Sequence, residues 1–182
     1  MDVDVNPNGR ESAAVVPMSA GGGSQALTWK VEAGPDGLIR VSLRGEVDEN
    51  ANLVKLASDM KGRVTLDLAD VRRINSAGVR EWVNFVRNLP NVEEMEFVRC
   101  SPTIVNQLNM IYNFRGEAVV KTFFAPYLCE HCDVEVDVLL DVDVHFHDRD
   151  PKHVPEFRCQ HCGNLLEFDD IPERYFAFVA QV

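Results

Sequence analysis

Residues 66–79 read LDLADVRRINSAGV, and this stretch decides how the fold is interpreted. An apolar strand over 64–68 is followed by a polar turn, and an amphipathic helix is predicted over 77–88. Asn75 and Ser76 are both residue types that cap helices well. The first N–H groups of a helix lack intrahelical partners and lie at the positive end of the helix dipole. The Ser76 hydroxyl is therefore either part of a simple cap or a place where a phosphate would be stabilised.

Outward from this stretch, hydrophobic periodicity predicts strands that alternate with helices. Strands are predicted over 27–32, 38–43, 64–68, 95–98 and 119–124, and helices over 51–60, over 77–88 and from Pro102 onward. Such alternation favours an α/β fold in which parallel strands are joined by crossover helices. Residues 1–24 are rich in glycine, serine, asparagine and proline without any period, so we expect a disordered N-terminal arm.

Residues 27–125 resemble a STAS domain, the fold of the anti-sigma-factor antagonists, in the order of these elements and in several short motifs. The motifs are LRGEVD at 43–48, VTLDL at 64–68, INSAGV at 74–79 and CSP at 100–102. The family's switch motif is Asp-Ser-x-Gly, and a partner kinase phosphorylates its serine. Ser76 and Gly78 match this motif, whereas Asn75 replaces the aspartate. The resemblance implies a STAS-like mixed sheet with crossover helices over 25–125.

The resemblance also implies a function. It implies a non-enzymatic regulatory protein that binds an anti-sigma factor or a related serine kinase through Asn75, Ser76, Gly78 and Arg80. Phosphorylation of Ser76 would end that complex. Because the family also serves as non-switching scaffold subunits, the alternative is an interaction subunit in which Ser76 is only a cap. We expect no catalysis, since the sequence shows no phosphate-binding loop and no nucleophile-and-base combination.

Two C-x-x-C motifs, CEHC at 129–132 and CQHC at 159–162, are separated by 26 residues. Four thiolates, from Cys129, Cys132, Cys159 and Cys162, can form a tetrahedral shell around one structural zinc ion. Two redox motifs are a poorer interpretation, because neither motif begins a helix in a βαβ unit. Disulfides are disfavoured in a chain that we expect to be cytoplasmic.

Residues 126–182 resemble a zinc ribbon, a small β module with too little core to fold without metal. Valine alternates with acidic residues in strands predicted over 134–138 and 140–146, and a further strand is predicted over 165–168. His131 and His161 are expected to be exposed, because four cysteines already complete the shell. His145, His147 and His153 are expected in a solvated loop rather than in a second metal site, and Cys100 as a buried thiol at a strand end.

The formal net charge of −11 is concentrated at the carboxyl end, where residues 129–182 carry −9. This acidity disfavours direct nucleic-acid binding and favours a protein partner, which in the scaffold alternative binds the acidic ribbon. No apolar run is long enough to span a membrane, and the amino end lacks an export signal. We therefore expect a cytoplasmic protein without a membrane partner.

Overall fold

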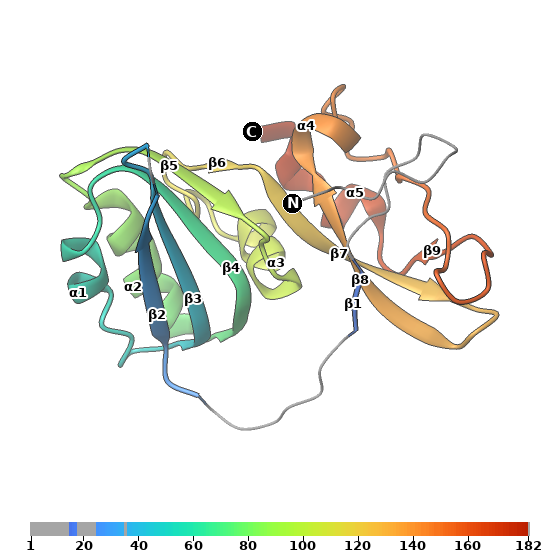
Figure 1. Cartoon of the computed structure of the whole chain (residues 1–182), viewed down its shortest axis with the longest axis horizontal. Coiled ribbons are helices and arrows are strands. Elements are labelled where there is room, and N and C mark those ends of the chain that lie inside the picture. Colours follow the sequence, from blue (N-terminus) through green and yellow to red (C-terminus); the bar gives the residue numbers. More distant parts are fainter. Residues whose placement is uncertain (1–14, 18–24, 35, 182) are drawn as a thin grey trace.

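The computed structural model describes residues 15–17, 25–34 and 36–181. It contains a sheet of five strands and a sheet of four strands, which lie side by side with helices packed on them (Figure 1). The protein is therefore mixed α/β, as the sequence indicates. In the described part of the chain, no helix combines the length and apolarity needed to cross a bilayer.

The five-stranded sheet has the order β2-β3-β4-β5-β6, with β2 antiparallel to β3 and the other neighbours parallel. Helices α1, α2 and α3 make the crossovers between the parallel strands, as the alternating pattern predicts. The bounds are β2 Thr28–Ala33, β3 Ile39–Val47, α1 Leu53–Ser58, β4 Gly62–Ile74, α2 Ser76–Arg87, β5 Val92–Val98, α3 Pro102–Met110 and β6 Val119–Val120.

The buried face of α2 centres on Trp82. Its ring stacks on Phe114 with centroids 5.5 Å apart, and its indole N–H donates to the Phe114 carbonyl at 2.9 Å. Phe97 from β5 packs edge-on against the same indole. Phe85 and Val86 are buried on this face beside Trp82. The helix is thereby held on the sheet by one fully buried aromatic whose polar atom is satisfied.

The polar turn predicted after residue 68 is wrong, because β4 continues to Ile74. β5 pairs with β4 only over residues 62–67, so the rest of β4 pairs with β3 alone. Polar side chains are suited to this half-covered extension. In it, Arg73 lies opposite Glu46 of β3 and forms an ion pair with it at 3.7 Å.

The four-stranded sheet is antiparallel and has the order β1-β8-β7-β9. Along the chain, the short helix α4 follows β8, and the short helix α5 and a 3-10 helix, η1, follow β9 (Figure 1). The bounds are β1 Val15–Pro17, β7 Thr122–Cys129, β8 Val134–Asp141, α4 Val142–His145, β9 Glu167–Phe168, α5 Pro172–Tyr175 and η1 Ala177–Gln181.

Several boundaries differ from the sequence expectations. Residues 15–17 belong to a strand, β1, rather than to a disordered arm, while residues 1–14 and 18–24 lie outside the described residues. The chain leaves the first sheet after β6 and joins the second at Thr122, although we placed the domain boundary after residue 125. The strand predicted over 140–146 is wrong, because the Asp141 carboxylate accepts the N–H groups of Asp143 and Val144 and thereby starts α4.

The second sheet has a substantial aromatic core of its own, contrary to the expectation of too little core. Phe123 of β7 contacts three aromatic rings with centroids 5.0–6.0 Å away. Phe168 stacks on Phe176 at 4.7 Å. Burial of several aromatic side chains supplies a large hydrophobic stabilisation without any metal. The fully or nearly fully buried rings are Phe123, Tyr127, Phe146, Tyr175, Phe176 and Phe178.

Helix α3 joins the two sheets, since it packs against β4 and β7 and against α5 and η1. Asn109 of α3 bridges to the carboxyl end of the chain with both ends of its amide. Its Nδ2 donates to the Tyr175 carbonyl at 2.8 Å, and its Oδ1 accepts the Phe178 N–H at 2.8 Å. The hydrophobic core is continuous across this junction.

We expect Asn109→Ala to lower the free energy of unfolding by about 1–3 kcal/mol, because it leaves two partly buried backbone groups unpaired. Asn106→Ala, an exposed asparagine on the same helix, is the matched control and should change stability little. Denaturant titration followed by tryptophan fluorescence and far-ultraviolet circular dichroism measures both. Equal stability of the two variants would contradict the bridging role of Asn109.

Candidate functional site

The amino end of α2 is capped by Asn75, as the sequence indicates. Its Oδ1 accepts the Gly78 N–H at 2.7 Å, and its Nδ2 donates to Glu49 Oε2 at 3.0 Å. The second bond lowers the pKa of the Glu49 carboxyl. An aspartate at position 75 would keep the cap but would lack this donor and would place a second carboxylate beside Glu49. The hydrogen bond to Glu49 thus explains why position 75 is an asparagine.

Ser76 is the first residue of α2 and is exposed. In the described structure its hydroxyl makes no hydrogen bond. Arg80, one helical turn later, is also exposed, and its nearest acidic neighbour is Glu81 at 3.8 Å. Residues four apart on a helix share one face. The structure therefore brings Asn75, Ser76 and Arg80 together at one solvent-facing helix end.

Gly78 lies on the buried side of the same turn and allows a close approach between elements. A Cβ at this position would lie 2.0 Å from the Val47 carbonyl oxygen and 2.5 Å from its carbonyl carbon. The Asn75 N–H donates to that same carbonyl oxygen at 3.2 Å. A glycine is thus required at position 78 because the helix packs closely against the end of β3. Gly78 is buried, contrary to the expectation that it contacts a protein partner.

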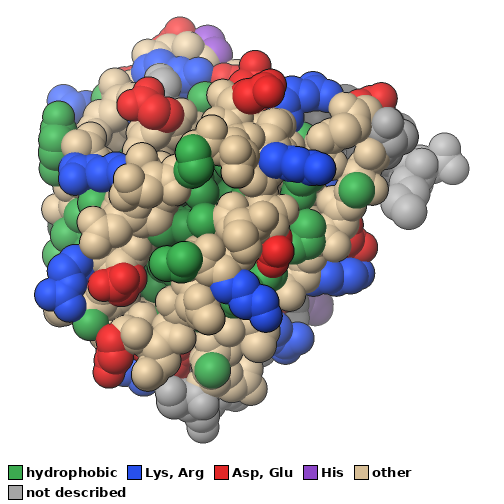
Figure 2. All heavy atoms as spheres, turned by 90° about the vertical axis from the view of Figure 1, so that its left-hand side faces the viewer, with side chains coloured by type: hydrophobic (Ala, Val, Ile, Leu, Met, Phe, Trp, Pro, Cys, Tyr) green, Lys and Arg blue, Asp and Glu red, His purple; other side chains and the backbone are tan. Residues whose placement is uncertain are grey.

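A groove with a volume of about 530 Å³ runs between α1 and α2 and reaches Glu49. Asparagine side chains line much of it, together with Val54 of α1 and Phe85 of α2. Figure 2 shows this face of the molecule, where hydrophobic side chains gather at the centre and charged ones surround them. Val54 is 84% exposed, so the rim of the groove offers apolar surface.

The second candidate site is formed by Cys129, Cys132, Cys159 and Cys162. The four Sγ atoms all lie within 4.8 Å of one another, and two of the pairs are 3.6 and 3.9 Å apart. In a tetrahedral shell with metal–sulfur bonds of about 2.3 Å, neighbouring sulfurs would be about 3.8 Å apart. None of the four cysteines is in a disulfide. The arrangement is compatible with one metal ion held by four sulfurs.

Each cysteine motif lies in a tight turn, and the two turns are closed by different backbone hydrogen bonds. The first turn connects β7 to β8, and the Cys132 N–H donates to the Cys129 carbonyl at 3.2 Å. In the second turn the Gly163 N–H donates to the Cys159 carbonyl at 2.9 Å. The residue after each motif has a left-handed conformation, with φ of 53° at Asp133 and 74° at Gly163. This conformation favours glycine and is tolerated by aspartate.

The backbone of the second motif polarises its first sulfur. The N–H groups of Cys162 and His161 donate to Cys159 and lower its thiol pKa to about 6. By contrast, the hydrogen bond with Cys162, together with burial, raises the pKa of Cys132 to about 12. Four thiols held this close resist ionising together unless a cation is present. A bound cation would remove that conflict.

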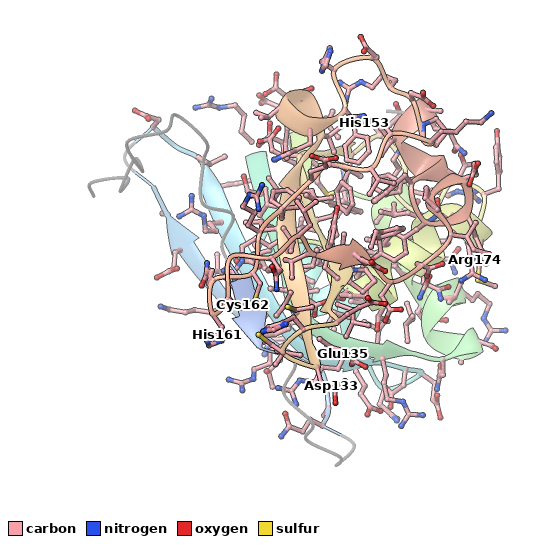
Figure 3. All side chains as sticks on the ribbon, turned by 90° about the vertical axis from the view of Figure 1, so that its right-hand side faces the viewer. Asp133, Glu135, His153, His161, Cys162 and Arg174 are labelled. Carbon is pink, nitrogen blue, oxygen red and sulfur yellow. The ribbon has the colours of Figure 1, made fainter. Side chains whose placement is uncertain are left out.

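Tyr127 of β7 positions the second motif. Its hydroxyl donates to the Pro155 carbonyl at 2.8 Å, and its ring meets Phe157 edge-on at 5.5 Å. Figure 3 shows Cys162 and His161 at the same end of the module as Asp133, while His153 lies at the other end. His131 and His161 are exposed, as expected.

The remaining sequence candidates lie apart from this cluster. In the described residues, the four cysteines are the one set of ligands grouped closely enough for a metal ion. His145 is in α4, where its Nδ1 lies 2.9 Å from the backbone nitrogen of Asp141, and so it is not in a solvated loop. Cys100 is fully buried at the end of β5, as predicted, and burial raises the pKa of its thiol.

Sequence analysis missed two contributors to these sites. Glu49 binds Asn75 and does not cap the next helix, since Asn52 caps α1 by accepting the Lys55 N–H. Nothing in the sequence indicated the left-handed conformation of Asp133 except its position. It directly follows the first cysteine motif, as Gly163 follows the second.

Comparison with known proteins found no relative of this chain. No protein-family model matches the chain, and no curated protein matches it.

Gly78→Ala is expected to destabilise the protein by about 1–3 kcal/mol, because the methyl group must displace the backbone of Val47. Helix propensity alone predicts the opposite sign, a gain of about 0.5–1 kcal/mol. Asn84→Ala, an exposed position of the same helix, is the control that should gain stability. Thermal unfolding distinguishes the two accounts, and a stabilised Gly78→Ala variant would refute the close approach.

Proposed function

We propose that this chain is a non-enzymatic regulatory protein, similar to STAS-domain anti-sigma-factor antagonists, that is switched by phosphorylation of Ser76. The observation that carries the proposal is the exposed Ser76 hydroxyl on the first residue of α2. The order of the first sheet supports the STAS resemblance, since one antiparallel edge strand is followed by parallel strands in chain order. The partner is an anti-sigma factor or a related serine kinase in the cytoplasm.

A phosphate on Ser76 has favourable neighbours. It lies at the positive end of the α2 dipole, beside first-turn N–H groups that have no intrahelical partner. Arg80 is one turn away on the same exposed face and is paired only weakly with Glu81. The added charge of about −1.5 to −2 would be costly to bury in an interface. Phosphorylation would therefore stabilise the free protein and weaken its complex.

The scaffold alternative is favoured by one specific observation. The Glu49 carboxylate is held against Asn75, the residue next to Ser76, so a phosphate would have an acidic neighbour. In that alternative Ser76 remains a plain helix residue, and the acidic surface of the second module binds the protein partner. Residues 129–182 have a net charge of −9, which suits a basic protein surface and repels nucleic acid.

The cysteine cluster is proposed to bind one structural zinc ion, as in a zinc ribbon. Four thiolates satisfy the coordination number of zinc and leave no position for water or substrate. The four sulfurs come from two turns, whereas the rings of Phe123, Phe168 and Phe176 pack on one another without them. We therefore expect the metal to fasten these turns together rather than to fold the whole module.

Elemental analysis should find one zinc per chain in the native protein. Cys132→Ser and Cys162→Ser should lose the metal and increase amide exchange at 129–134 and 157–166, while the two sheets stay folded. Cys100→Ala is the matched control, because it removes a thiol outside the cluster and should keep the zinc. Metal loss in that control, or full zinc content in Cys132→Ser, would contradict the proposed ligand set.

Phosphorylation is tested by incubating the full chain with an extract of the source cells and ATP. Intact mass should show one phosphoryl group on the native chain and on Ser58→Ala, but none on Ser76→Ala. Ser58 is an exposed serine at the last turn of α1, where the dipole disfavours negative charge. Labelling of Ser76→Ala at the native level would exclude the switch and leave the scaffold alternative.

A further inference from the structure

The outer edge of β8 is only partly occupied. β7 pairs with all of Val134–Asp141 on one side, whereas β1 pairs with residues 136–138 on the other. In the described part of the chain, no strand pairs with the outer edge on either side of these three residues. Open N–H and C=O groups at a strand edge are a template for another strand.

Acidic side chains lie along this edge strand. Glu135 and Asp137 are two residues apart, so their side chains share one face of β8. Asp133 precedes them at the turn. Within the described residues, the Oδ1 atom of Asp137 is buried and has no hydrogen-bond partner. Burial, with Glu135 adding to it, raises the pKa of Asp137. A buried carboxylate oxygen without a partner costs free energy that a nearby donor would recover.

The strand that now covers this edge is a poor complement to it. β1 is three residues long and places Val16 opposite Asp137 and Pro17 opposite Val136. Proline has no N–H, so the ladder lacks a donor at position 17. Residues 1–17 contain three acidic residues and one basic residue, so the arm has the same sign of charge as the edge.

We propose that the outer edge of β8 is a docking site for an extended basic segment of a partner protein, which adds as a strand in place of β1. Lysine or arginine side chains of that segment would lie opposite Glu135 and Asp137, where opposite charges on facing strands attract. A second copy of this chain fits less well, because two β8 edges would bring like charges together. The inference is independent of Ser76, because it concerns a different sheet.

The probe is a short synthetic peptide of alternating lysine and valine, titrated by fluorescence anisotropy into the full chain. Val16→Pro removes an N–H from β1 and should tighten peptide binding about tenfold by weakening the internal competitor. Val5→Pro, a valine of the same arm outside β1, is the matched control and should leave the affinity unchanged. Glu135→Gln combined with Asp137→Asn should weaken binding about tenfold and reduce its salt dependence.

Amide exchange then locates the complex. Peptide binding should protect residues 134–141 and leave the first turn of α2 unchanged. A peptide with the same charge but a central proline cannot form the ladder and should not bind. Equal binding of that peptide, no tightening in Val16→Pro, or protection outside β8 would each overturn the proposal. So would a stable dimer of Val16→Pro that excludes the peptide.

Discussion

Burial of α3 between the two sheets is the constraint on which the rest of the structure depends. Its apolar side chains, from Ile104, Val105 and Leu108, enter the core. Asn109, on the same helix, uses both ends of its amide on backbone groups of the last residues. One helix therefore supplies a hydrophobic surface to the first sheet and a directional polar contact to the second. The cap at Asn75 and the four cysteines belong, as a result, to one continuous body.

In this arrangement, the second module is stabilised by aromatic packing as well as by any metal bound to its cysteine cluster. The rings of Phe146, Phe176 and Phe178 pack around Phe123. The sulfurs lie where β7 turns into β8 and where residues 157–166 fold back on themselves. A module that needs metal to fold has few such rings to bury. Here the metal ligands belong to a module whose aromatic rings are part of the core that runs through both sheets.

Local features such as helix caps could be predicted from the sequence, because one or two neighbouring residues determine them. Asn75 caps α2, and Ser101 with Pro102 starts α3, because capping depends on nearest neighbours along the chain. Spacing likewise predicted which four cysteines meet. The pairing and packing of segments far apart in the chain could not be predicted from the sequence. The extension of β4 past residue 68 depends on its pairing with β3 and on hydrogen bonds from Ser101 and Thr103 at the start of α3. Likewise, α5 is too short to be stable without the packing of Tyr175.

Cys100 has a consequence for measurements on the intact protein. Its sulfur is enclosed where β5 meets β7, at the bridge between Cys100 and Phe123, and its high pKa keeps it protonated. An alkylating reagent reaches such a thiol only when the two sheets come apart. The rate of its modification would therefore report how often this junction opens, a motion that zinc content and peptide binding do not detect.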